Sequence, residues 1–162
     1  HCYGPGLWRL LMVPLSDRLA HALVGASPDA ILLVAPDGLI CYANASVTSI
    51  LGWAPDALVG ENVSVLVPEA KRPEHADQVR HFASHRATRT MGQRRELKAR
   101  HVDGNLVDVD IKLAPIALDD PMVAVYLRDI TALREAEREV ARGIRELAEA
   151  HAKLARESAA RG

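Results

Sequence analysis

Residues 30–44 read Ala-Ile-Leu-Leu-Val-Ala-Pro-Asp-Gly-Leu-Ile-Cys-Tyr-Ala-Asn and hold the clearest structural signal in the chain. Two short apolar runs, Ile31–Val34 and Leu39–Ala43, stand on either side of Pro36-Asp37-Gly38. Proline presets φ at the first corner of a turn, and glycine supplies the positive φ that closes one. Short apolar runs bounded by turn residues are typical of buried strands. The stretch therefore predicts a β-hairpin.

A short helix is expected directly after this hairpin, over residues 45–51. Asn44 stands where its side chain can accept hydrogen bonds from the first helical amides. Gly52 is a typical residue for the end of such a helix. We therefore predict Asn44 as the helix cap and Gly52 as the helix stop.

The remaining patterns predict three further strands and several helices. Ser16 is a typical cap for an amphipathic helix over Asp17–Val24. Helical segments are expected over Pro55–Val59, Val63–Leu66 and Glu74–His85, and strands over Arg94–Val102, Leu106–Leu113 and Met122–Leu127. Two strands before the helices and three after them predict an α+β fold, a five-stranded antiparallel sheet with its helices on one face.

The strand expected over Leu106–Leu113 alternates between apolar and charged side chains. Because successive side chains of a strand point to opposite faces, this period of two separates a core face from a wet face. The inward set is Val107, Val109, Ile111 and Leu113, and the set expected to face water is Asp108, Asp110 and Lys112.

The order of these segments resembles a PAS sensor domain of the S-box type. The resemblance is carried by the hairpin with Asn44, the short helix and Gly52-Trp53, and then by Gly60-Glu61-Asn62, Val67-Pro68-Glu69, Asp103-Gly104 and Tyr126-Leu-Arg-Asp-Ile-Thr131. It implies an N-terminal segment with a flanking helix over residues 1–26, a PAS domain over 27–131 and a C-terminal signalling helix over 132–162. It also implies a sensing and dimerising module rather than an enzyme.

A PAS sensor takes its signal between the sheet and the helices, so the resemblance implies an apolar pocket there for a small ligand. The residues expected to line it are Ile31, Leu33, Ile40, Val79, Phe82, Val109, Ile111 and Val125. The same residues also suit a filled core, and a purely structural dimerisation domain is therefore an alternative function.

Haem is a further alternative, because part of the chain resembles the FixL-type haem PAS domains. In those domains a histidine of the long helix ligates iron and an arginine of the next strand steadies the bound gas. His75 and Arg95 occupy similar places in this sequence, but Gln93 and Arg94 are polar where a porphyrin needs apolar walls. The flavin-binding LOV relatives need a reactive cysteine after Gly60, where this chain has Val63-Ser-Val65, and this excludes flavin adduct chemistry.

The residues after Ala132 predict one long helix with a narrow apolar seam. Leu133, Val140, Ile144, Leu147 and Leu154 recur at coiled-coil spacing, with Glu137 and His151 at the intervening seam positions. A narrow seam is buried by pairing, and PAS relatives imply parallel pairing in a homodimer. At the start of the helix, Asp129 and Thr131 are expected to form the joint that passes a signal to an output domain or partner protein.

Composition excludes several other classes of function. The formal net charge is −1, which gives no electrostatic case for nucleic acid or a membrane surface. No apolar run approaches the ~20 residues that span a bilayer, and the nucleotide-binding loops and nucleophile motifs of common enzymes do not occur. Cys2 and Cys41 are the only cysteines, and Cys41 is expected to pack as a small apolar residue. These features favour a cytoplasmic protein without a disulfide framework.

Overall fold

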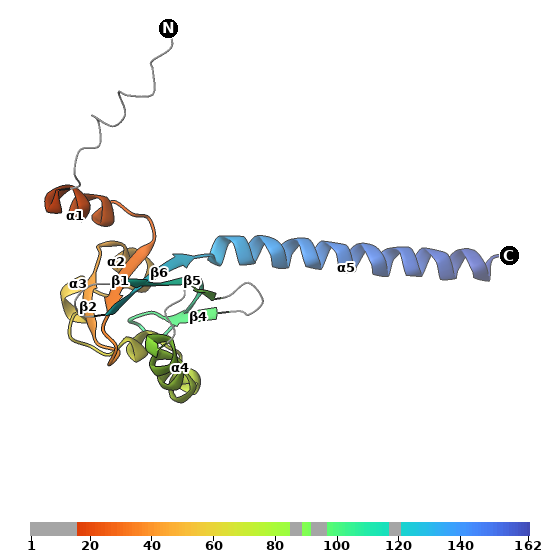
Figure 1. Ribbon diagram of the computed structural model, residues 1–162. Helices are drawn as coiled ribbons and strands as arrows, with labels where there is room; N and C mark the ends of the chain where they lie inside the picture. Colours follow the sequence, from red (N-terminus) through yellow and green to blue (C-terminus); the bar gives the residue numbers. More distant parts are fainter. Residues whose placement is uncertain (1–15, 85–88, 92–96, 117–120) are drawn as a thin grey trace, which may run out of the picture.

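The centre of the molecule is an antiparallel sheet in the order β2-β1-β6-β5-β3, with β4 also paired to β5 (Figure 1). The computed structural model describes residues 16–84, 89–91, 97–116 and 121–162. The strands are β1 (Ala30–Val34), β2 (Ile40–Ala43), β3 (Arg89–Met91), β4 (Leu97–Arg100), β5 (Leu106–Ile116) and β6 (Met122–Asp129).

Strands β3 and β4 occupy one position in the sheet. Met91 pairs with Ile111 of β5, and Leu97 pairs with Val109 two residues further along the same edge of β5. The other edge of β5 is taken by β6. The sheet is therefore five strands wide, as the sequence predicts, with one position built from two segments.

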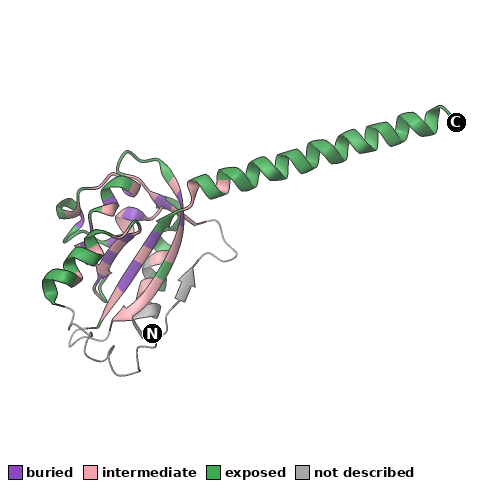
Figure 2. Ribbon diagram, turned by 90° about the horizontal axis from the view of Figure 1, so that it is seen from above, coloured by how far each residue is buried: buried purple, intermediate pink, exposed green. Residues whose placement is uncertain are grey.

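Helices and short helical turns cover the inner face of this sheet. They are α2 (Ser46–Leu51), α3 (Pro55–Leu58), η1 (Val63–Leu66), η2 (Glu69–Lys71) and α4 (Arg72–Ser84). Leu51, Leu58 and Leu66 of this layer pack into one buried cluster with Leu32 and Val125 of the sheet. In Figure 2 the buried segments, drawn in purple, lie on strands of the sheet and on the neighbouring helices. The PAS-like α+β layout predicted from the sequence is confirmed.

Two helices flank this domain. Helix α1 (Asp17–Gly25) precedes the sheet, and its cap is the predicted one, since Ser16 Oγ accepts a hydrogen bond from Leu19 N at 3.2 Å. Helix α5 (Thr131–Ala160) follows β6 and runs for 30 residues away from the body of the molecule (Figure 1). Every residue of the chain from Glu135 onward is exposed.

The structure corrects the role predicted for Asn44. The residue before α2 is Ala45, and no side chain caps that helix. The Asn44 side chain turns instead toward the segment before β1. There its Oδ1 accepts from Ile31 N at 2.9 Å, and its Nδ2 donates to Val24 O and Asp29 O, both at 3.0 Å. Asn44 is only 2% exposed. Its buried side chain binds these three backbone groups instead of the first amides of α2, which were the partners predicted from the sequence.

Two other local expectations have different outcomes. The helix stop at Gly52 is confirmed, because Gly52 has a left-handed φ of 73° and its amide bonds to Thr48 O. A side chain at this position would also collide with His101. Cys41, which was expected to be buried, is exposed on β2, because the buried ends of that strand are Ile40 and Ala43.

Candidate signalling junction

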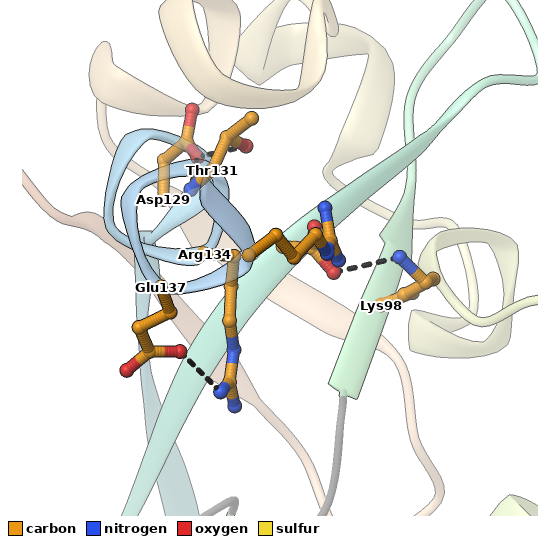
Figure 3. Close-up of polar contacts among 7 residues, drawn as sticks. Lys98, Asp129, Thr131, Arg134 and Glu137 are labelled. Atoms are coloured by element: carbon orange, nitrogen blue, oxygen red, sulfur yellow. Dashed lines mark hydrogen bonds and ion pairs between the residues drawn. The ribbon is translucent and has the colours of Figure 1, made fainter. Parts of the chain in front are cut away.

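The passage from β6 into α5 brings Asp129 and Thr131 into direct contact, as Figure 3 shows. Asp129 Oδ1 accepts hydrogen bonds from Thr131 N at 2.8 Å and from Thr131 Oγ1 at 2.6 Å. The strand-end carboxylate therefore satisfies the first amide of the helix, which has no partner within the helix itself. This is the arrangement on which the predicted joint depends.

Arg128, one residue earlier, makes a separate connection to the start of the domain. Its guanidinium binds both oxygens of Asp29, each at 3.0 Å, and hydrogen bonding to Asp29 raises the pKa of Arg128. The backbone carbonyl of Asp29 is also one of the three partners of Asn44. A chain of polar contacts thus runs from the end of α1 through Asn44 and Asp29 to the end of β6.

Asp108 of β5 is the junction residue that sequence reasoning missed. It was expected to face water, yet it is 7% exposed. Its Oδ1 accepts from Lys98 Nζ of β4 at 2.6 Å, and its Oδ2 accepts from an Arg138 guanidinium nitrogen of α5 at 3.2 Å. The hydrogen bond from Lys98, with a further one from Arg138, lowers the pKa of Asp108. The carboxylate is therefore buried as an anion with two cationic partners.

The burial of Asp108 comes from α5, which begins over this end of the sheet. The Asp108 carbonyl accepts from Ile130 N at 2.9 Å, directly before the helix. An acid in an alternating strand normally indicates a wet face, and the sequence holds no short-range sign that a helix thirty residues later will cover it. The only available signal was Lys98, which lies directly opposite Asp108 in the register.

The seam of α5 lies on a different side of the helix from this contact. Thr131 and Arg134 are the half-buried residues of the first turns, and Arg138 follows on the same face. At 100° a residue, that face is roughly two fifths of a turn from the seam. The seam residues are each more than half exposed, with 56% for Leu133, 63% for Val140, 65% for Ile144, 65% for Leu147 and 63% for Leu154. Docking of α5 on its own sheet thus leaves the apolar stripe uncovered.

Glu137, at a seam position, is held by a neighbour on the docked face. Arg134 donates to Glu137 Oε2 at 2.8 Å (Figure 3). The seam therefore begins with one apolar residue, Leu133, and a carboxylate already paired within its own helix.

The structure brings together only part of the predicted ligand pocket. Ile40, Val109 and Val125 belong to the buried cluster, and Val79 and Ile111 are half-buried and pack against it. Ile31 and Leu33 lie on the opposite face of β1, because Ala30, Leu32 and Val34 are its buried residues. An apolar strand without alternation does not reveal which set of side chains faces the core. The side chain of Phe82 lies outside the described part of the structure.

His75 lies on the first turns of α4 and is half-buried. Burial lowers the pKa of His75, which favours a neutral imidazole. Arg95, its expected partner in a haem site, lies outside the described residues. Among the residues that the structure describes, no cluster of three or more histidines, cysteines and acids could hold a metal ion. In the same part of the chain, no helix is long and apolar enough to cross a bilayer.

Comparison with known proteins gives a consistent set of relatives. The sequence matches the PAS fold family over residues 18–130. It is 23% identical to the sensor protein FixL of Bradyrhizobium diazoefficiens over 72% of this chain and 24% of that protein. It is 22% identical to the oxygen sensor protein DosP of Escherichia coli over 68% of this chain and 14% of that one. The chain thus spans a quarter or less of the length of these two curated relatives.

A solved structure supports the same assignment of fold. The PAS domain of an HTR-like protein from Haloarcula marismortui superposes with a TM-score of 0.61 at 22% identity, covering 76% of this chain and 99% of that one. The family match covers well over half of the chain, and the antiparallel sheet, the helical layer and the exit helix agree with it. The chain belongs to the PAS family.

Proposed function

We propose that this chain is a sensory and dimerising PAS module that passes a signal through α5 to an output domain or partner protein. The observation that carries the proposal is the construction of α5. Its first turns are fastened to the sheet at Asp129 and Asp108, while its apolar seam is exposed over the following turns. A helix fixed to a domain at one end and unpaired along its length is suited to transmit a change in that domain to a partner.

The partner proposed for the seam is a second copy of this chain. Outside Glu137 and His151, the seam positions from Leu133 to Leu154 are aliphatic. The positions that flank the seam are mostly small, for example Ala141, Gly143 and Ala148, and small flanks let two helices approach closely. Parallel pairing in a homodimer would bury all five apolar seam residues at once.

The proposed signal is a small apolar ligand held against the inner face of the sheet. Ile111 and Val79 are half-buried at the margin of the core cluster, and they are the positions where a ligand would meet both the sheet and α4. Since Ile111 lies on the strand that also carries Asp108, a ligand at this place would act on the strand to which α5 is fastened.

Mass spectrometry tests the ligand directly. The protein, purified natively, is expected to release a small molecule on denaturation. Ile111→Phe should lose that molecule because the larger ring fills its place, whereas Val102→Phe, on an exposed turn residue, should retain it. A native mass equal to that of the bare chain would contradict ligand binding and, for a protein that still dimerises, would favour the purely structural dimerisation domain.

Haem-based gas sensing is a second candidate because His75 is half-buried with a lowered pKa. A neutral imidazole is the form that binds iron, and haem, when bound, would supply the iron that takes up a gas. On the inner face of the sheet, however, Leu32, Val109 and Val125 belong to one buried cluster with Val47 and Leu51, so protein side chains already cover these positions.

Absorbance spectroscopy decides the haem question. We expect no Soret band in protein from cells grown with a haem precursor, and His75→Ala should give the same spectrum as the parent chain. A Soret band that disappears in His75→Ala, but persists in His21→Ala on α1, would contradict this expectation.

A further inference from the structure

We infer that Asp108 is a latch that fixes the direction in which α5 leaves the domain, with Arg138 as the helix half of the latch and Lys98 as its link to β4. The inference deepens the proposed function, because the direction of α5 matters for signalling only if α5 carries the signal. It concerns contacts within one chain and therefore does not depend on dimerisation.

The argument begins with two attachment points on one residue. The Asp108 carbonyl receives the amide of Ile130, at the start of α5, and the Asp108 carboxylate receives Arg138. The two helix residues are eight positions apart, about 12 Å along the axis of an α-helix. A helix held only at its start can pivot about that point, whereas a second attachment two turns later fixes its axis.

The burial of the carboxylate is the second step. Asp108 has 8% of its side chain exposed, against 35% for Lys98 and 55% for Arg138. A buried carboxylate requires charged or hydrogen-bonding partners, while a guanidinium at the surface can be satisfied by water. Asp108 therefore holds Arg138 in place more firmly than an exposed acid could.

The third step is the sharing of the carboxylate. Each oxygen of Asp108 has one cationic partner. Oδ1 accepts from Lys98 of β4, the contact that ends at the labelled Lys98 in Figure 3, and Oδ2 accepts from Arg138 of α5. Lys98 and Asp108 are directly opposite in the β4–β5 register, so a displacement of β4 moves Lys98 relative to the carboxylate. The position of one strand and the direction of the exit helix are thus joined through a single side chain.

Arg142 of α5 forms ion pairs that do not link the helix to the sheet, and it therefore provides a control. Arg142, one turn beyond Arg138, donates to Glu139 Oε1 at 2.6 Å and approaches Glu146 Oε1 at 3.9 Å. Both partners lie on α5 itself. The loss of Arg142 removes a helix arginine and its pairing without removing a contact to the sheet.

Electron spin resonance distance measurement between the sheet and the helix tests the latch. One nitroxide is attached to the exposed native Cys41 on β2 and one to Ala152→Cys on α5, in a Cys2→Ser background. Labelled chains are diluted with unlabelled chains so that only distances within one chain are recorded. The parent protein is expected to give one narrow distribution.

Arg138→Gln and Asp108→Asn should each broaden the distribution, and the double variant should be no broader than Asp108→Asn alone because that change already removes the Arg138 contact. Arg142→Gln should stay narrow. Lys98→Gln should shift the mean distance, which reports the link to β4.

A distribution in Arg138→Gln as narrow as that of the parent protein would overturn the latch, as would equal broadening in Arg142→Gln. An unchanged mean in Lys98→Gln would overturn the link to β4. Light scattering on the same unlabelled proteins reports dimerisation separately, so failure of the latch and failure of the proposed dimer are distinguishable.

Discussion

At the scale of single residues, two buried polar side chains hold segments together that are distant in the sequence. Asn44 joins the end of α1, the linker at Asp29 and the start of β1. Asp108 joins β4, β5 and α5. Both are buried, and a buried polar group that loses its partners costs far more than an exposed one.

Replacing Asn44 by alanine should therefore destabilise the fold strongly. The change removes three hydrogen bonds and leaves Ile31 N, Val24 O and Asp29 O without that partner, so we expect a loss of about 2–4 kcal/mol in the free energy of unfolding. Chemical denaturation followed by circular dichroism measures it. Asn105→Ala, at an exposed turn where the side chain donates to Asp103, should cost far less, and equal losses in the two variants would contradict this role.

Asp108 should make stability depend on pH. Its folded-state pKa is lowered by Lys98 and then Arg138, so the folded protein binds this proton less readily than the unfolded chain does. The resulting stability is present above the ordinary aspartate pKa of about 4 and is lost as the pH falls through and below that value.

The measurement is a series of denaturation curves in increasingly acidic buffer. Asp108→Asn should be less stable than the parent protein at neutral pH and should lose less on acidification. If the free energy of unfolding falls with pH in the same way in the parent protein and in Asp108→Asn, the Asp108 contacts do not contribute to the loss of stability in acid.

At the scale of secondary-structure elements, most patterns that the sequence displays locally predicted the structure, and the Asn44 helix cap is the exception. The hairpin, the Ser16 cap and the Gly52 stop depend on residues within a few positions of one another, and all are present. The sequence could not show that Ile31 and Leu33 face away from the core, because five consecutive apolar residues have no alternation. The burial of Asp108 was likewise hidden, since its cover comes from another element.

The joint between β6 and α5 should be more important for signalling than for folding. Asp129→Ala removes the two hydrogen bonds to Thr131, and loss of such a cap costs about 1 kcal/mol. We expect the variant to fold with slightly lower stability and, when tested together with an output domain, to respond weakly or not at all to the signal. Normal switching at that lower stability would identify the contact as an ordinary helix cap.

At the scale of the whole molecule, the chain consists of a compact domain and a helix that extends from it (Figure 2). The family and the layout of the domain were predictable from the sequence, because they depend on the order of many short motifs. The seam of α5 was predictable from its periodicity, and the structure leaves these residues exposed in a single chain. Its partner is a proposal, because a seam at heptad spacing predicts pairing but does not identify the other helix.

The molar mass in solution tests the central proposal most directly. Multi-angle light scattering of the chain at micromolar concentration should give twice the monomer mass of 17.6 kDa. Ile144→Asp with Leu147→Asp places charges in the seam and should give the monomer mass, whereas Ala152→Asp with Arg156→Asp, off the seam, should still give the dimer. A monomer mass for the unaltered chain, or a dimer that persists in Ile144→Asp with Leu147→Asp, would contradict pairing through α5.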